Sequence, residues 1–248
     1  MNRPRPLSTD FRRTIRRWAI GATTAVLAWS HRRQRVTPGA SPVKVNVGCG
    51  LTVAEGWINI DGSISAWVAT LPKPFHRLAY RLSGAHDYFT LDEYCRILRH
   101  NRFVHHELAY GLPLADGTVD FILLSHLLEH LDRLQAASFL GECLRALKGG
   151  GVIRVAVPDL EEAWRMYGRG EKERMLHDFF FVEPLAAYAQ HRWAYDVDLL
   201  GASLRAAGFT GIERCACGQG ATPDLAALDN RAEYTLYVEA RRPAGEIR

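Results

Sequence analysis

The stretch Val-Asn-Val-Gly-Cys-Gly, residues 45–50, joins a short β-branched run to a pair of glycines. The run Val43–Val47 predicts a strand, and the glycines end it. Because glycine has no Cβ, such a turn lets backbone N–H groups approach a bound ligand closely. The stretch lacks the G-x-G-x-x-G spacing of dinucleotide-binding proteins, so it does not by itself predict a pyrophosphate site.

Outward from this stretch, short apolar runs alternate with helical patterns. Further strands are predicted at residues 57–60, 103–107, 119–124, 152–157, 209–214 and 234–239. Helices are predicted at 125–148 and 196–207. Strands that alternate with helices build a parallel sheet covered on both faces. We therefore expect an α/β fold of the Rossmann-like, doubly wound type, with a mostly parallel seven-stranded sheet.

The linker Val36–Pro42 is rich in proline and small residues and predicts a boundary. Residues 1–42 are interpreted as a basic arm with its linker, and residues 43–248 as the body. Within the body, residues 63–100 are predicted to be a helical insertion and residues 160–195 a lid region. A chain of 248 residues fits one domain with additions better than two equal domains.

The arm carries most of the positive charge. Residues 1–35 have a net charge of +8, and the rest of the chain has −4. On a helix its apolar residues form one stripe: Phe11, Ile15, Trp18, Ala22, Val26 and Trp29. The apolar run 18–29 is too short for a transmembrane helix, which needs about 20 residues. Two interpretations stay open: residues 10–35 form a basic amphipathic helix on an anionic membrane surface, or the arm packs on the body or is a flexible basic tail.

In an open parallel sheet, ligands bind at the carboxyl ends of the strands. Asp61 ends the second predicted strand, where a carboxylate can accept hydrogen bonds from ribose hydroxyls, and Glu107 ends the third, where it can accept from the amine of adenine. Asp61 follows Gly50 by 11 residues, against about 20 in dinucleotide-binding proteins. The pattern therefore predicts a site for an adenosine group without a diphosphate.

Several motifs, in order along the chain, resemble one enzyme family. They are Val-Asn-Val-Gly-Cys-Gly (45–50), Gly-Trp-Ile-Asn-Ile-Asp (56–61), Leu-Pro-Leu-Ala-Asp-Gly-Thr-Val-Asp-Phe-Ile (112–122), Ser-His-Leu-Leu-Glu-His-Leu (125–131) and Leu-Lys-Gly-Gly-Gly-Val-Ile-Arg-Val-Ala-Val-Pro-Asp (147–159). Together they resemble the class I S-adenosylmethionine-dependent methyltransferases, and within them the methyltransferase-11-like group. The resemblance covers about residues 43–240 and implies S-adenosyl-L-methionine as the cofactor.

The resemblance also implies roles for single residues. Gly48, Cys49 and Gly50 would line the methionine part of the cofactor, and Asp61 would hold the ribose. Glu107 and Leu108 would lie at the adenine, although the family more often has Asp where Glu107 stands. Ser125 and His126 would face the sulfonium side.

The segment Ser125–Leu131 contains H-x-x-E-H, a spacing found in some zinc peptidases. A zinc hydrolase using His126, Glu129 and His130 is therefore an alternative function. A metallopeptidase also needs a third ligand from elsewhere, and no separate ligand motif is evident. Because the methyltransferase pattern already explains the segment, we expect no metal, and structural roles for Glu129 and His130. For His126, contact with cofactor or acceptor and a structural role both stay open.

If the methyl acceptor is a hydroxyl, a base is needed. The catalytic candidates are His126, His191 and Asp159. The segment His-Arg-Trp-Ala-Tyr-Asp (191–196) favours acceptor binding, with Arg192 for an anionic group and Tyr195 for stacking; His177 is a further candidate. The alternative is a packed loop in which Asp196 caps the next helix.

We therefore expect a methyltransferase that acts on a small-molecule or glycan acceptor, such as a cell-surface polysaccharide or lipid-linked precursor. It would work in the cytoplasm, peripherally on the inner face of the membrane. A noncatalytic interaction module with a cofactor-binding fold is a second alternative. Nucleic acid is disfavoured as a partner because the body is net acidic. The five cysteines are scattered without a C-x-x-C pair, which favours reduced thiols.

Overall fold

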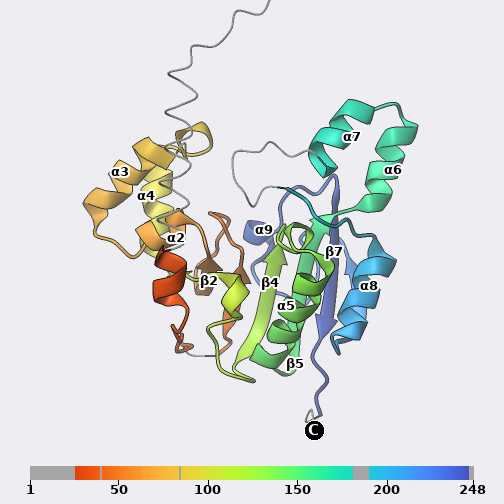
Figure 1. Ribbon diagram of the computed structural model, residues 1–248, viewed down its shortest axis with the longest axis horizontal. Helices are drawn as coiled ribbons and strands as arrows, with labels where there is room; N and C mark the ends of the chain where they lie inside the picture. The colour runs from red at the N-terminus through yellow and green to blue at the C-terminus, as the bar shows by residue number, and fades with distance from the viewer. Residues whose placement is uncertain (1–25, 40, 84, 181–189, 246–248) are drawn as a thin grey trace, which may run out of the picture.

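The computed structural model describes residues 26–39, 41–83, 85–180 and 190–245. These residues build a seven-stranded sheet in the order β3-β2-β1-β4-β5-β7-β6, with helices on both faces (Figure 1). The strands are β1 (Lys44–Val47), β2 (Trp57–Asp61), β3 (Arg102–His105), β4 (Val119–Ser125), β5 (Leu147–Pro158), β6 (Thr210–Cys215) and β7 (Thr235–Arg241). The strands from β3 to β5 pair in parallel, and β7 runs antiparallel to both β5 and β6. The expected Rossmann-like sheet is thus confirmed.

The central strands form because they bury both of their faces. In β1, Val45 and Val47 have no exposed surface, and Ile60 of β2 and Ile122 of β4 are equally buried. Between β1 and β2 the opposite face is polar: the side-chain amide of Asn46 donates to Oδ1 of Asn59 over 3.3 Å. Buried alternating residues of this kind fix the register, so the strand ends lie at defined positions.

Two groups of helices flank the carboxyl ends of the parallel strands (Figure 1). On the β1–β3 side lie α2 (Ile64–Val68), α3 (Lys73–Ser83), η1 (Ala85–Asp87) and α4 (Leu91–His100). On the β5–β7 side lie α6 (Leu160–Gly168) and α7 (Lys172–Phe179). The remaining elements are η2 (Leu108–Tyr110), η3 (Leu128–His130), α5 (Arg133–Ala146), α8 (Val197–Ala206) and α9 (Leu225–Leu228).

The segment after β4 differs from the single helix expected at 125–148. It forms a loop with the short η3 turn, and α5 begins only after Asp132. Asp132 and Gln135 form a capping box there: the Asp132 side chain accepts from the Gln135 N–H, and the Gln135 side chain accepts from the Asp132 N–H. The cap leaves residues 126–131 outside the helix, and their side chains are free to turn toward the strand ends.

The described part of the arm lies against the body. Residues 26–31 are helical, Ala28 and Val36 are buried, and the N–H of Val36 donates to the carbonyl of Pro113 over 2.7 Å. Trp29, in contrast, is 62 % exposed. The stripe residues Phe11 to Ala22 lie outside the described residues. None of the described helices has the length and apolar character that crossing a membrane requires.

Candidate functional site

The turn after β1 and the end of β2 meet as neighbours. The N–H of Gly48 donates to the carbonyl of Ile60, and the N–H of Gly50 donates to Oδ2 of Asp61, both over 2.8 Å. The other carboxylate oxygen of Asp61 accepts from the N–H of Ser63 over 2.7 Å. Each oxygen keeps a second lone pair, so Asp61 is held in place and can still accept from a ligand hydroxyl.

The two glycines of this turn have different roles. Both have a positive φ, +67° at Gly48 and +51° at Gly50, and residues other than glycine rarely adopt such a backbone angle. A Cβ on Gly48 would lie 2.9 Å from Cδ1 of Leu127, so this glycine admits close packing by the loop after β4. A Cβ on Gly50 would meet no atom within 4 Å, so this position borders open space beside Asp61.

A second carboxylate stands after β3. Glu107 occupies the N-cap position of the η2 turn without a side-chain capping hydrogen bond, and Leu108 begins the turn and packs against the main core. A Cβ on Gly62 would lie 3.4 Å from Oε2 of Glu107, so Glu107 lies beside the residue that follows Asp61. The space at Gly50 and the two carboxylates at the ends of β2 and β3 fit an adenosine with a methionine chain.

Cys49, between the two glycines, is 6 % exposed and packs with the helices on the β1–β3 side. Burial raises the pKa of its thiol well above the ordinary value, and the charge of Asp61 acts in the same direction. Cys49 therefore stays protonated at neutral pH, which suits a side chain that lines a site and not a nucleophile. All five cysteines are free thiols.

The loop after β4 carries the next predicted residues. Ser125 is the last residue of the strand, and His126 follows with φ +50°, a strained conformation for a residue other than glycine. Two contacts hold His126: its Nδ1 lies 3.2 Å from Oε1 of Glu129, and its Nε2 lies 3.3 Å from Oγ1 of Thr235. The Thr235 hydroxyl donates to the carbonyl of Arg231, so its oxygen can only accept from His126. These contacts favour a positioning role for His126.

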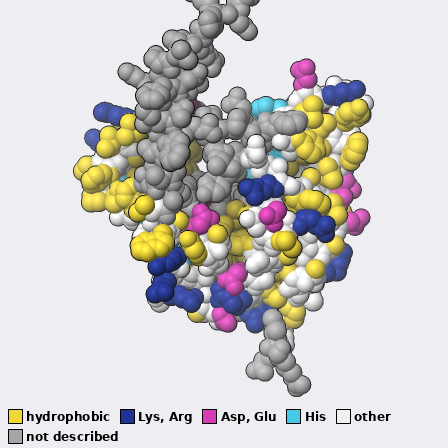
Figure 2. Space-filling view, viewed as in Figure 1, with side chains coloured by type: hydrophobic (Ala, Val, Ile, Leu, Met, Phe, Trp, Pro, Cys, Tyr) yellow, Lys and Arg dark blue, Asp and Glu magenta, His cyan; other side chains and the backbone are white. Residues whose placement is uncertain are grey.

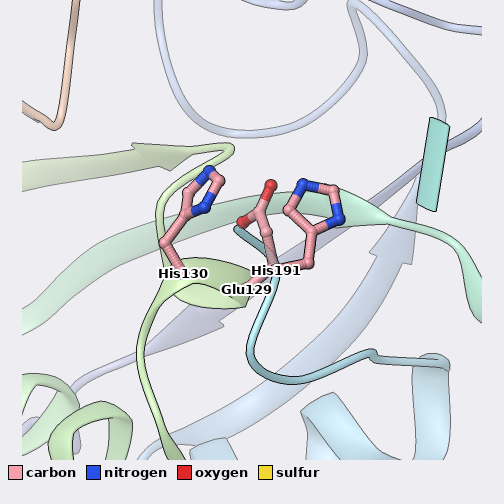
Figure 3. A group of neighbouring side chains, drawn as sticks. All are labelled: Glu129, His130 and His191. Atoms are coloured by element: carbon pink, nitrogen blue, oxygen red, sulfur yellow. The ribbon is translucent and has the colours of Figure 1, made fainter. Parts of the chain in front are cut away.

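Glu129 lies at the centre of a cluster with His130 and His191 (Figure 3). Its side chain is 2 % exposed, although the rings on either side are more accessible. The backbone joins the two segments, because the N–H groups of Arg192 and Trp193 both donate to the carbonyl of Glu129, over 2.7 and 3.2 Å. Burial lowers the pKa of His191, so its ring is neutral at pH 7. We call these three residues the Glu129 cluster.

Asp159, at the end of β5, has both carboxylate oxygens engaged. Oδ1 caps α6 by accepting from the N–H of Glu161, and Oδ2 pairs with Arg214 over 2.9 Å. Burial raises the pKa of Asp159, although the Glu161 N–H and Arg214 oppose this. This catalytic candidate therefore has a structural role in the fold, as a helix cap and as a partner in an ion pair.

The predicted acceptor residues are spread out. Tyr195 is 2 % exposed and lies within the main core, and burial raises the pKa of its hydroxyl to about 12. Arg192 is exposed beside the Glu129 cluster, and Asp196 caps α8 through the N–H of Leu199. His177 lies on α7, with an exposed ring whose Nδ1 is 2.8 Å from Asp178. Of these residues, only Arg192 is an exposed residue next to the Glu129 cluster.

Sequence reasoning left Glu129, His130 and Thr235 out of the predicted site. The H-x-x-E-H spacing was the signal for the first two, but it pointed to a set with His126. In the structure His126 faces Glu129 itself, and the partner that completes the cluster is His191. Nothing in the pattern around Thr235 indicated a contact with a residue 109 positions away.

Comparisons with known proteins bear on this geometry. The methyltransferase-11 family model, described as a methyltransferase domain, matches residues 71–155. Among curated proteins no sequence match is found.

The chain is similar to several solved S-adenosylmethionine-dependent methyltransferases. One from Thermotoga maritima shares 17 % identity over 95 % of this chain and 96 % of the other, with a TM-score of 0.44. One from Archaeoglobus fulgidus shares 14 % over 89 % and 93 %, also at 0.44. One from Aquifex aeolicus shares 16 % over 88 % and 89 %, at 0.43.

The family match begins shortly before α3 and ends within β5, so the glycine turn and Asp61 lie outside it, toward the N-terminus. The sheet order and the space at Gly50 fit the same cofactor. The family match and the sheet order support a class I methyltransferase domain, and the space at Gly50 fits S-adenosylmethionine as its cofactor.

Proposed function

We propose that this methyltransferase acts on an oxygen atom of a small-molecule or glycan acceptor, and that the acceptor oxygen lies at the Glu129 cluster. The observation that carries the proposal is Glu129 itself. It is a buried carboxylate with one oxygen, Oε2, that has no hydrogen-bond partner among the described residues. The loop that holds it packs through Leu127 against Gly48, so the cluster and the cofactor turn are adjacent.

Methyl transfer needs little activation of the methyl group by the protein. When bound, the cofactor supplies a methyl group on a sulfonium, already activated for displacement. The acceptor O–C bond forms as the C–S bond breaks, the sulfur keeps the electron pair, and the hydroxyl proton leaves. The protein must align the acceptor, exclude water and provide for that proton. A group of two imidazoles and a carboxylate at the strand ends can meet the last need.

Surface features support an acceptor that is attached to lipid. Both helix groups beside the strand ends expose large apolar side chains, which appear yellow in Figure 2. On α3 these are Phe75 and Leu78, half exposed, and on α6 Trp164 is 69 % exposed. Exposed apolar groups around a site are typical of proteins that act at a membrane.

The arm supports the same placement. Val26 and Trp29 lie on one helical stripe and are 66 % and 62 % exposed, and the guanidinium of Arg32 lies 4.0 Å from the Trp29 ring centre. A basic residue stacked on an exposed Trp suits an anionic headgroup layer. We propose that residues 10–35 rest on the inner face of the membrane and that the acceptor is a cell-surface polysaccharide or lipid-linked precursor.

Methyl transfer itself is the first test. The protein is incubated with S-adenosylmethionine and a panel of monosaccharides, nucleotide sugars and polyprenyl-linked saccharides, and S-adenosylhomocysteine release is measured. Oxygen methylation of a saccharide, reduced about 100-fold or more in Glu129→Gln, is the expected result. Release with amine or nucleic acid acceptors alone would overturn the proposal.

Cofactor binding is tested separately by calorimetry. Asp61→Ala is expected to weaken S-adenosylmethionine binding by about 10- to 100-fold, because it removes a charged hydrogen-bond acceptor. Asp87→Ala, on the exposed η1 turn, is the matched control and should bind like wild type. No binding at millimolar cofactor would favour the noncatalytic module.

Vesicle flotation tests the arm. Full-length protein should float with phosphatidylglycerol vesicles and stay behind with phosphatidylcholine vesicles. A chain that starts at residue 26 keeps the contacts of Ala28 and Val36 with the body, so it isolates the lost residues. Equal flotation of the two chains, or of the full chain and Trp29→Ser, would contradict the proposal.

A further inference from the structure

The Glu129 cluster brings three possible metal ligands together from two distant segments. Glu129 and His130 come from η3, and His191 comes from the segment before α8 (Figure 3). One ligand atom from each side chain lies within 4.8 Å of the other two. Around a zinc ion with bonds of 2.0–2.1 Å, tetrahedral ligands lie roughly 3.3 Å apart. Small side-chain rotations would therefore close the set around an ion.

Backbone carbonyls orient both imidazoles for this role. Nδ1 of His130 lies 3.2 Å from the carbonyl of Gln190, and Nδ1 of His191 lies 2.7 Å from the carbonyl of Phe179. A carbonyl can only accept, so each Nδ1 carries the proton and each Nε2 keeps its lone pair. Metal-binding histidines are held in this way, with the second ring nitrogen donating to a backbone carbonyl or carboxylate.

Glu129 provides an independent observation. Its Oε1 faces Nδ1 of His126, but its Oε2 is buried without a hydrogen-bond partner in the described part of the chain. A buried carboxylate oxygen without a partner is costly, and a cation is the partner that would satisfy it. His126 then holds the carboxylate in place, as the neighbours of metal ligands commonly do.

The cluster is also rigidly built. The two N–H donors that hold the Glu129 carbonyl join η3 to the segment before α8, and a β-bridge from Tyr195 to Asp159 joins that segment to the end of β5. The ligand positions are therefore fixed by main-chain contacts before any ion binds, which reduces the cost of binding.

We propose that Glu129, His130 and His191 bind a divalent first-row transition metal ion, with zinc as the expected occupant. Two imidazoles and one carboxylate suit zinc, iron, cobalt or nickel, whereas magnesium and calcium prefer oxygen ligands alone. This set replaces the expectation of no metal. It also differs from the zinc-peptidase pattern, because His191 takes the place of His126.

Three protein ligands leave coordination positions for a substrate oxygen. Resting on the proposed function, we assign these positions to the acceptor hydroxyl. A hydroxyl bound to the ion releases its proton to water more readily, as metal-bound water does, and the resulting oxygen attacks the methyl group. The cluster would then provide for the hydroxyl proton through the ion that it holds.

The test uses untagged full-length protein, stripped with a chelator and reloaded with Zn²⁺ or Co²⁺. Metal content by mass spectrometry and the visible spectrum of the Co²⁺ form are the readouts, and neither needs cofactor or acceptor. Wild type should hold a stoichiometric ion, and Glu129→Gln and His191→Gln should lose at least about 100-fold in affinity. His100→Gln, an exposed histidine at the end of α4, is the matched control and should bind as wild type does.

Metal binding that is equal in wild type and both cluster variants would overturn the proposal, as would no binding at micromolar metal. The two proposals fail in different ways. A stoichiometric ion that depends on the cluster, without methyl transfer to any oxygen acceptor, would sink the proposed function and leave the metal site standing. Oxygen methylation that survives chelation, in protein without metal, would overturn the assignment of the acceptor hydroxyl to the ion and leave the proposed function standing.

Discussion

Among the described residues, two buried clusters of charged side chains are built in opposite ways. The first joins Arg154 of β5 to Asp229 and to Glu239 of β7. Arg154 is fully buried and donates to both oxygens of Asp229, over 3.0 and 2.6 Å, and to Oε1 of Glu239 over 3.1 Å. Backbone N–H groups of residues 218, 221 and 222 donate further hydrogen bonds to the two carboxylates.

In the Glu129 cluster, by contrast, the hydrogen bonding of the buried carboxylate is incomplete. Oε2 of this carboxylate has no hydrogen-bond partner in the described part of the chain, and one ligand atom from each of the three side chains lies within 4.8 Å of the other two. A buried polar group that is satisfied within the chain holds the structure together, whereas one left unsatisfied calls for an explanation such as a bound ion or a catalytic role. The difference therefore separates a structural network from a functional one, and it can be tested on stability and binding at the same time.

The largest expected effect on stability comes from Arg154→Ala. It leaves two buried carboxylates without their cation, which lowers the free energy of unfolding by about 3–5 kcal/mol. Denaturant titration followed by circular dichroism measures this. Arg165→Ala, which breaks exposed pairs with Glu161 and Glu162 on α6, is the control and should leave the midpoint nearly unchanged. Equal effects of the two variants would remove the distinction between buried and exposed networks.

Gly48→Ala tests the contact between the cofactor turn and the loop that holds Glu129. The positive φ and the 2.9 Å approach to Leu127 should together lower the free energy of unfolding by about 1–3 kcal/mol. Gly50→Ala shares the positive φ but meets open space, so it should cost less stability and weaken cofactor binding instead. Equal losses of stability in both variants would mean that the Leu127 contact does not contribute to the free energy of unfolding.

Acid should have a smaller effect on stability, through a pair of histidines that cannot both be protonated. Nδ1 of His31 and Nδ1 of His105 lie 3.1 Å apart, so at least one ring must be neutral. Burial lowers the pKa of His105, the charge on His31 adds to this, and Asp61 opposes it.

The sign follows from the lowered pKa. Below about pH 6.5 the unfolded chain binds the proton and the folded chain does not, so stability falls as the pH drops. The slope for His105 is at most about 1.4 kcal/mol per pH unit. Denaturant titrations at roughly pH 7.5 and 5.5 would measure it, and His105→Gln should flatten the slope. An unchanged slope would show that the pair does not titrate with folding.

The same comparison explains what the sequence could predict. Gly48, Gly50 and Asp61 are local signals, because a strand, its turn and the end of the next strand lie within 20 residues. The Glu129 cluster is not local: His191 lies 61 positions after His130, and the carbonyl of Phe179 sets which of its ring nitrogens keeps a lone pair. Missing partners and ring tautomers are properties of tertiary packing, so no spacing could show them. The H-x-x-E-H pattern grouped Glu129 and His130 with His126, whereas the structure places His191 beside them.

Glu129→Gln should have the smallest effect on stability and the most informative one. Glutamine has the same shape and removes the charge, so the unfolding free energy should change by no more than about 1 kcal/mol in either direction. Denaturant titration of protein stripped of metal gives this number beside the one for Arg154→Ala.

Binding should show the reverse order for the same two substitutions. Glu129→Gln should lose the metal and the methyl transfer, whereas any folded Arg154 variant, such as Arg154→Lys, should keep the metal. If Glu129→Gln destabilised the protein as much as Arg154→Ala, the Glu129 carboxylate would already have its partners within the chain. The open oxygen would then be no guide to a ligand, because the two clusters would be structural networks of one kind.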